Sequence, residues 1–124
     1  MNKSFWAALF VSFFAIAALG GCAHTARYSP SEISGYPPAV QKYIRQQTVA
    51  MGMTPNQVRF AWGAPTYITV LPPSLNGEPR EEWTYKELLG TAHTTLVFTG
   101  GRVTEMSAKG PTSKKFIVPG SPIQ

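Results

Sequence analysis

The sequence predicts one small α+β domain, in which two helices precede four β-strands. Apolar residues recur at helical spacing in two segments between residues 39 and 62. From residue 66 onward, short runs rich in Val, Thr, Tyr and Phe are separated by turns that contain Gly, Pro and Asn. The chain of 124 residues has room for one such domain, which we place at residues 39–108.

The start of the chain has the pattern of an export signal. Lys3 gives a basic beginning, residues 5–19 form an uncharged apolar run of 15 residues, and two glycines and Cys22 follow. A helix needs about 20 apolar residues to span a bilayer, which disfavours a permanent transmembrane segment. We therefore predict a signal peptide over residues 1–21.

Cys22 is the only cysteine, so it has no partner for an intrachain disulfide. The sequence LGGC resembles the bacterial lipobox, in which cleavage makes the cysteine the first residue and acyl chains are attached to it. That resemblance implies a lipid anchor at Cys22. Because Ala23 follows instead of Asp, it also implies the outer membrane, with the protein facing the periplasm. The alternative is an ordinary small-residue cleavage site with an incidental cysteine nearby.

Residues 22–38 are predicted to form a tether or extended arm. The segment is rich in Ser, Pro and Gly and has neither a helical nor a strand period. One interpretation is a plain spacer. Tyr28, Ile33 and Tyr36 are large apolar groups that a spacer does not need, so the alternative is that part of the arm docks on the domain or on a partner.

Residues 39–51 predict the first helix, which begins after Pro38 and ends at Gly52. Val40, Tyr43 and Ile44 fall at helical spacing, and Met51 extends the same pattern. The narrow apolar stripe indicates a helix that packs on a sheet, and it disfavours a helix that lies on a membrane.

The stretch MGMTPNQVRFAWGAP specifies the second helix. Thr54 and Gln57 have the spacing of a capping box, in which each side chain accepts a hydrogen bond from a backbone N–H at the helix start. Gly63 is placed to be the left-handed residue that ends the helix, and Pro65 prevents its continuation. We expect a helix this short to be held by tertiary packing.

Four strands are predicted, and the last two flank a Gly-Gly turn at residues 100–101 that favours a tight hairpin with positive φ. Counting across this turn pairs Phe98 with Val103 and Leu96 with Glu105. A charged partner for Leu96 gives the last strand a mixed inner face, which a bulge or an edge position near Glu105 would resolve. The predicted strands are residues 66–71, 81–86, 93–99 and 102–108.

Residues 109–124 are predicted to be a flexible basic tail. Lys109, Lys114 and Lys115 stand beside the apolar run 116–118, but Pro, Gly and Ser surround them. That composition favours a flexible end over a fifth strand.

Groups for catalysis are sparse, and we predict a non-catalytic protein with no cofactor and no metal. The chain has no Asp, its histidines are His24 and His93, and it lacks a G-x-S-x-G nucleophile elbow. Two His and no Cys pair do not supply the usual zinc spacing. All six Glu and all Lys and Arg except Lys3 lie after residue 21, which gives residues 22–124 a net charge of +4. This charge suits a position near anionic phospholipid, and nucleic acid is disfavoured for an exported, anchored chain.

Four stretches follow the lipobox in order: GMTPNQV, WGAPT, EEWTY and LVFTGGRV. Together they resemble the small protein A and outer-membrane lipoprotein A (BamE-like) family over about residues 52–106. The resemblance implies two helices packed on one face of an antiparallel sheet of three to four strands. Its structural motif comprises Gly52, Thr54, Gln57, Gly63, Pro65, Trp83, Tyr85, Phe98, Gly101 and Val103.

The same resemblance implies an accessory role in outer-membrane β-barrel assembly and envelope integrity. The expected partners are subunits of the assembly machinery and an anionic phospholipid such as phosphatidylglycerol. Spacing differences before residue 52 and after the Trp-x-Tyr strand, together with the basic tail, leave a second hypothesis open. It is an envelope-stress or inhibitor-like binding lipoprotein outside the assembly complex. The stretch YSPSEISGY resembles the family's arm, and the contacts that it implies are Tyr28, Pro30, Ile33 and Gly35.

Overall fold

A computed structural model describes residues 27–87 and 89–118 of the chain. Within these residues the protein is α+β, with short helices and an antiparallel sheet of four strands. The elements in chain order are α1 (Pro30–Ile33), α2 (Pro38–Arg45), β1 (Thr48–Ala50), α3 (Pro55–Trp62), β2 (Tyr67–Leu71), β3 (Arg80–Lys86), β4 (His93–Thr99), β5 (Arg102–Lys109) and β6 (Lys115–Ile117).

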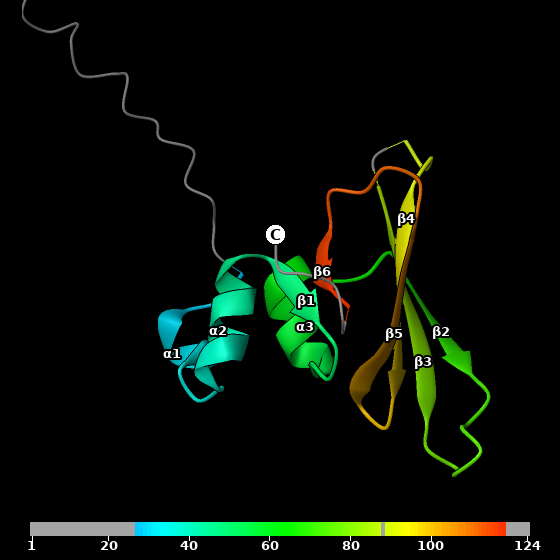
Figure 1. Cartoon of the computed structure of the whole chain (residues 1–124), viewed down its shortest axis with the longest axis horizontal. Coiled ribbons are helices and arrows are strands. Elements are labelled where there is room, and N and C mark those ends of the chain that lie inside the picture. Colours follow the sequence, from blue (N-terminus) through cyan, green and yellow to red (C-terminus); the bar gives the residue numbers. More distant parts are fainter. Residues whose placement is uncertain (1–26, 88, 119–124) are drawn as a thin grey trace, which may run out of the picture.

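The four-stranded sheet has the order β2-β3-β4-β5, and each neighbouring pair is antiparallel. β1 and β6 form a separate parallel pair. Figure 1 shows the helices and this small pair grouped to one side of the four-stranded sheet, with β2 at the margin farthest from the helices. The prediction of helices beside an antiparallel sheet is therefore confirmed.

The start of α3 has the predicted capping box. The Thr54 N–H donates to Gln57 Oε1 at 3.0 Å, and the Gln57 N–H donates to Thr54 Oγ1 at 3.4 Å. Gly63 ends the helix with a φ of +85°, which disfavours a side chain there. Its ψ of −166° lies outside the left-handed helical region, so the predicted left-handed cap is wrong in that respect.

The predicted helix over residues 39–51 is too long, because α2 ends at Arg45. Gln47 has a φ of +53°, which breaks the helical path, and Thr48–Ala50 then form β1. Val49 of this strand is fully buried, so a residue within the predicted helix reaches the core from a strand instead.

The expectation of a tail without a strand is wrong for Lys115–Ile117, which form β6. This strand runs parallel to β1, and Phe116 pairs with Val49. β5 also extends one residue beyond the predicted boundary, to Lys109.

The predicted hairpin is present between β4 and β5, and both alternatives for resolving the mixed inner face occur, since β5 is an edge strand and its pairing with β4 contains a bulge. Gly100 and Gly101 have φ values of +57° and +77°. Phe98 pairs with Val103 as predicted, and the register then shifts, so that Val97 pairs with Glu105. Leu96 consequently pairs with Met106. The expected pairing of Leu96 with Glu105 is wrong because the bulge intervenes.

The core lies between the sheet and the helices. Trp83 and Phe98 form its centre on the sheet, with ring centroids 4.7 Å apart. Gly52 joins the two layers, because its N–H donates to the Val103 carbonyl oxygen at 2.9 Å. The buried cluster comprises Ile33, Ile44, Val49, Met53, Val58, Ala61, Trp62, Trp83, Tyr85, Leu96, Phe98 and Val103.

Candidate interaction surfaces

The arm before α2 is packed against the domain over its described residues. Ile33 of α1 is fully buried in the core, and Arg27 Nη1 donates to the Ala61 carbonyl oxygen at 3.2 Å. Of the other predicted contact residues, Tyr28 is half-buried, and Pro30 and Gly35 are exposed. The plain-spacer interpretation is therefore wrong for this segment. The Ile33 side chain is not presented to a partner in this conformation.

Three half-buried rings form an aromatic trio where the arm meets α3: Tyr28, Tyr36 and Phe60. Phe60 is the central ring, and its centroid lies 6.3 Å from that of Tyr28 and 6.3 Å from that of Tyr36. Gln41 Nε2 holds the Tyr36 backbone by donating to its carbonyl oxygen at 2.8 Å. The trio presents apolar ring area together with two phenolic groups at one surface.

Glu32, the acidic residue of the arm, is hydrogen-bonded to Ser29 within the arm itself. The Ser29 N–H donates to a carboxylate oxygen of Glu32, and this hydrogen bond holds the pKa of Glu32 below its usual value. The charge is therefore kept at the start of α1, where it favours the helix.

The C-terminal segment forms a strap, which we define as residues 112–117. Glu87 holds one end: its Oε1 accepts from Thr112 Oγ1 at 2.8 Å and from the Ser113 N–H at 3.2 Å. The hydrogen bond from Thr112 is the main cause that lowers the pKa of Glu87, and Lys114 adds a smaller effect. Sequence reasoning did not find Glu87. The run of Phe, Ile and Val at 116–118 was the one available signal for a strand in the strap.

The middle of the strap lies over two core aromatic rings. Lys114 Nζ is 5.9 Å from the ring centroid of Trp62 and 5.6 Å from that of Tyr85. The Tyr85 hydroxyl donates to the Gly63 carbonyl oxygen at 3.0 Å, and burial raises the pKa of this phenol. Tyr85 is therefore a neutral hydrogen-bond donor that ties β3 to the end of α3.

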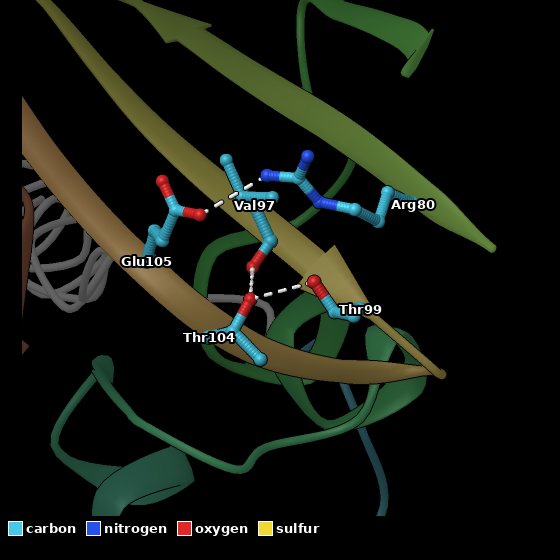
Figure 2. A network of polar contacts seen from close by, with 5 residues as sticks. All are labelled: Arg80, Val97, Thr99, Thr104 and Glu105. Carbon is cyan, nitrogen blue, oxygen red and sulfur yellow. Dashed lines mark hydrogen bonds and ion pairs between the residues drawn. The ribbon is translucent and has the colours of Figure 1, made fainter. Parts of the chain in front are cut away.

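The face of the sheet that points away from the helices is polar, and its groups bond to one another (Figure 2). Arg80 Nη2 and Glu105 Oε1 form an ion pair of 3.1 Å across Val97, which is 7% exposed. Thr104 Oγ1 donates to the Val97 carbonyl oxygen at 3.3 Å and shares a hydrogen bond of 2.9 Å with Thr99 Oγ1. These contacts hold β3, β4 and β5 together. The polar side chains that form them are thereby hydrogen-bonded or ion-paired within the sheet.

The described residues contain no group of three or more His, Cys, Asp or Glu side chains that could hold a metal ion. His93 is half-buried at the start of β4. What these surfaces offer is contact area, hydrogen-bonding groups and charge.

Cys22 and the predicted signal peptide lie outside the described residues. No helix within residues 27–87 and 89–118 has the length and apolar character that crossing a membrane requires. Searches of protein-family models, of curated proteins and of solved structures find no match to this chain.

Proposed function

We propose that the chain is an outer-membrane lipoprotein, anchored through Cys22 and facing the periplasm, with a non-catalytic accessory role in β-barrel protein assembly and envelope integrity. The observation that carries the proposal is the order of its motifs. A lipobox-like LGGC precedes GMTPNQV, WGAPT, EEWTY and LVFTGGRV. The BamE-like resemblance implies helices beside an antiparallel sheet, and an architecture of that kind supports it.

Contacts between these motifs also support the proposal. Gly52 of the first motif bonds to Val103 of the last, and Tyr85 of the third bonds to Gly63 of the second. Motifs that are weak individually therefore meet at one core. The contacts give the four motifs a common structural role, and this supports the resemblance to the family, in which the motifs occur in the same order.

The aromatic trio is placed well for contact with a lipid surface. Cys22 lies five residues before Arg27, a distance of at most about 18 Å in a fully extended chain. An acylated Cys22 would hold Tyr28 and its neighbours close to the headgroup region, where tyrosine combines an apolar ring with a polar tip. Contact with an anionic phospholipid such as phosphatidylglycerol is the role that we assign to this surface.

Two measurements in Gram-negative cells test the proposal. Palmitate should label the parent chain and not a Cys22→Ser variant, since the variant has no acylation site. Crosslinking of native membranes followed by affinity purification should recover at least one subunit of the barrel assembly machinery. If the chain is intact and labelled with palmitate but no such subunit is recovered, the role in barrel assembly is refuted, whereas the lipid anchor at Cys22 is retained.

The second candidate is an envelope-stress or inhibitor-like binding lipoprotein outside the assembly complex. The strap favours it, because this segment is not part of the family pattern and yet packs on the core through Phe116 and Lys114. A soluble periplasmic enzyme or peptidoglycan as the main crosslinked partner would favour this candidate over the first.

A further inference from the structure

A pocket of about 290 Å³ opens between α2, the turn that follows β1 and the start of β5. Most of its wall is apolar. Met53 belongs to the buried core, and all the other apolar lining residues except Pro37 pack against that core. Because the core holds these side chains in place, the pocket is largely formed before a ligand arrives. The apolar lining residues are Pro37, Val40, Tyr43, Ala50, Met51 and Met53.

Arg102 is the one charged residue among the lining residues that the structure describes. Its Nη1 donates to the Gly52 carbonyl oxygen at 3.0 Å, and this bond fixes the guanidinium beside the pocket. Within the described residues Arg102 has no ion pair, whereas Arg80 of β3 is paired with Glu105. A guanidinium has five N–H groups, so Arg102 keeps donors for a carboxylate, which binds such a group in bidentate fashion.

The helices beside the pocket favour an anion as well. Val40 lies in the first turn of α2 and Gln57 in the first turn of α3, and both residues line the pocket. The positive ends of the two helix dipoles therefore lie next to it. No glutamate is among the lining residues that the structure describes. The pocket thus combines an apolar wall with a positive potential, which suits a ligand that has an apolar group and a negative charge.

The volume of the pocket limits the size of the apolar group. A cavity of about 150 Å³ holds a benzene ring, whereas drug-sized ligands occupy pockets of about 300–1,000 Å³. A pocket of about 290 Å³ therefore suits one large apolar side chain together with the main-chain atoms next to it.

The last residue of a polypeptide supplies both groups at once, because its apolar side chain and its carboxylate are joined to the same Cα. A free amino acid has the same two groups, but Arg102 and the helix dipoles would repel its ammonium group. An internal Asp or Glu uses its side chain for the carboxylate, so a second residue would have to fill the apolar part. The size and the charge of the pocket together favour an apolar chain end.

We propose that this pocket binds the C-terminal residue of a partner polypeptide, with its apolar side chain between Val40 and Met53 and its carboxylate on Arg102. The site is separate from the aromatic trio and from the Cys22 anchor. It does not rest on either proposed function, because it depends only on the described residues.

Methyl NMR spectroscopy on the full chain in micelles of a neutral detergent tests the proposal. The chain has four methionines, of which Met51 and Met53 line the pocket, while Met106 lies on β5 and does not. With ¹³C-labelled methionine methyl groups, a bound peptide should shift the Met51 and Met53 resonances and leave that of Met106 in place. Titration of the shifts gives the Kd.

Four probes separate the contributions of the apolar group and the charge. The reference peptide is acetyl-Gly-Ser-Leu with a free carboxylate. Its amidated form lacks the charge, and acetyl-Gly-Ser-Ser with a free carboxylate lacks the apolar side chain, so each should bind at least about tenfold more weakly. The fourth probe, 4-methylpentanoate, has both groups without a peptide and should also bind more weakly than the reference.

Two matched variants locate the charge. Arg102→Gln should weaken binding of the reference peptide at least about tenfold and leave binding of the amidated peptide unchanged, because only a free carboxylate uses the guanidinium. Arg45→Gln removes the same charge from α2 outside the pocket wall and should change neither affinity. Both arginines are exposed, and circular dichroism should show the parent fold in both variants.

Equal affinity for the free and amidated peptides, or an Arg102→Gln variant that binds like the parent, would overturn the proposal. So would 4-methylpentanoate that binds as tightly as the reference peptide, because the ligand would then be a small amphiphilic anion. A shift of Met51 and Met53 on deletion of residues 119–124, before any peptide is added, would also overturn it, since the chain's own end would then fill the pocket.

Discussion

Trp83 makes more kinds of contact than the hydrophobic pattern alone predicts. It is 1% exposed, its ring packs on Phe98, and its Nε1 donates to Glu81 Oε1 at 2.9 Å. The Arg59 guanidinium lies 4.9 Å from the ring centroid. One side chain thus links the sheet, the end of α3 and a glutamate of its own strand.

Trp83→Ala should lower the free energy of unfolding by about 3–5 kcal/mol, because it removes a large buried side chain and leaves a cavity. Urea denaturation followed by circular dichroism measures the change. Tyr67→Ala is the control, since Tyr67 is half exposed and its loss should cost no more than about 1 kcal/mol, from its contact with Lys86 on the neighbouring strand. A Trp83→Ala variant as stable as the parent would contradict the position of Trp83 in the core.

Glu87 should make attachment of the strap depend on pH. Its folded-state pKa is lowered, chiefly by the hydrogen bond from Thr112. A lowered pKa stabilises the attached strap above the ordinary glutamate pKa of about 4.3, and this contribution is lost as the pH falls through the folded-state pKa. The Trp62 indole N–H resonance should report the change, because Lys114 and Phe116 lie against that ring.

Glu87→Gln should loosen the strap at neutral pH and remove the acid-dependent shift of that resonance. Glu78→Gln is a suitable control, because Glu78 is exposed on the loop before β3 and accepts no hydrogen bond from the strap in the described residues. An unchanged acid titration in the Glu87→Gln variant would assign the shift to another group.

At the scale of elements, the most accurate predictions are those that rest on local chemistry. The capping box at Thr54 and the Gly-Gly hairpin each depend on residues a few positions apart, and both are present. A bulge or an edge position was expected from the conflict between Leu96 and a charged partner, and the structure has both, because β5 is an edge strand and Thr104 is inserted in it. Short-range geometry is specified by short-range sequence.

Elements that depend on distant partners were missed. Thr48–Ala50 lie within the predicted helix, but in the structure they form a strand that pairs with β6 from the far end of the chain. Ile33 sits in a segment without periodicity, so its burial depends on packing against the rest of the domain. Of the predicted contact residues, Tyr28, Pro30 and Gly35 lie at the surface or partly so, while Ile33 does not. Pairing and burial of this kind cannot be read from local pattern.

Thr54→Ala should destabilise the domain by about 0.5–2 kcal/mol, because it removes the acceptor for the Gln57 N–H at the start of α3. Thermal unfolding compared with the parent measures the effect. Asn56→Ala, at an exposed position in the same helix turn, should change stability much less. Equal effects from the two substitutions would show that the capping box adds nothing beyond helix propensity.

At the scale of the whole molecule, positive charge is concentrated in the part of the chain that contains the helices. Residues 27–63 carry four basic residues and one Glu, a net charge of +3. Residues 67–118, which form the four-stranded sheet and the strap, carry six basic residues and five Glu, a net charge of +1. Next to an anionic membrane this asymmetry would favour an orientation with the helices and the aromatic trio toward the lipid.

This orientation predicts lipid binding that depends on the aromatic trio. Residues 22–124 carrying Cys22→Ser, which has no acyl chain, should sediment with vesicles that contain phosphatidylglycerol and much less with purely zwitterionic vesicles. Tyr28→Ala should weaken that binding about fivefold, corresponding to about 1 kcal/mol for an exposed part of one ring. Tyr67→Ala, which removes the same side chain from the opposite margin, should leave it unchanged. Tyr28 is only half-buried, so its variant should keep the parent's melting temperature to within a few degrees. Equal losses from both variants would contradict the orientation, because they would show that ring area matters to binding and its position does not.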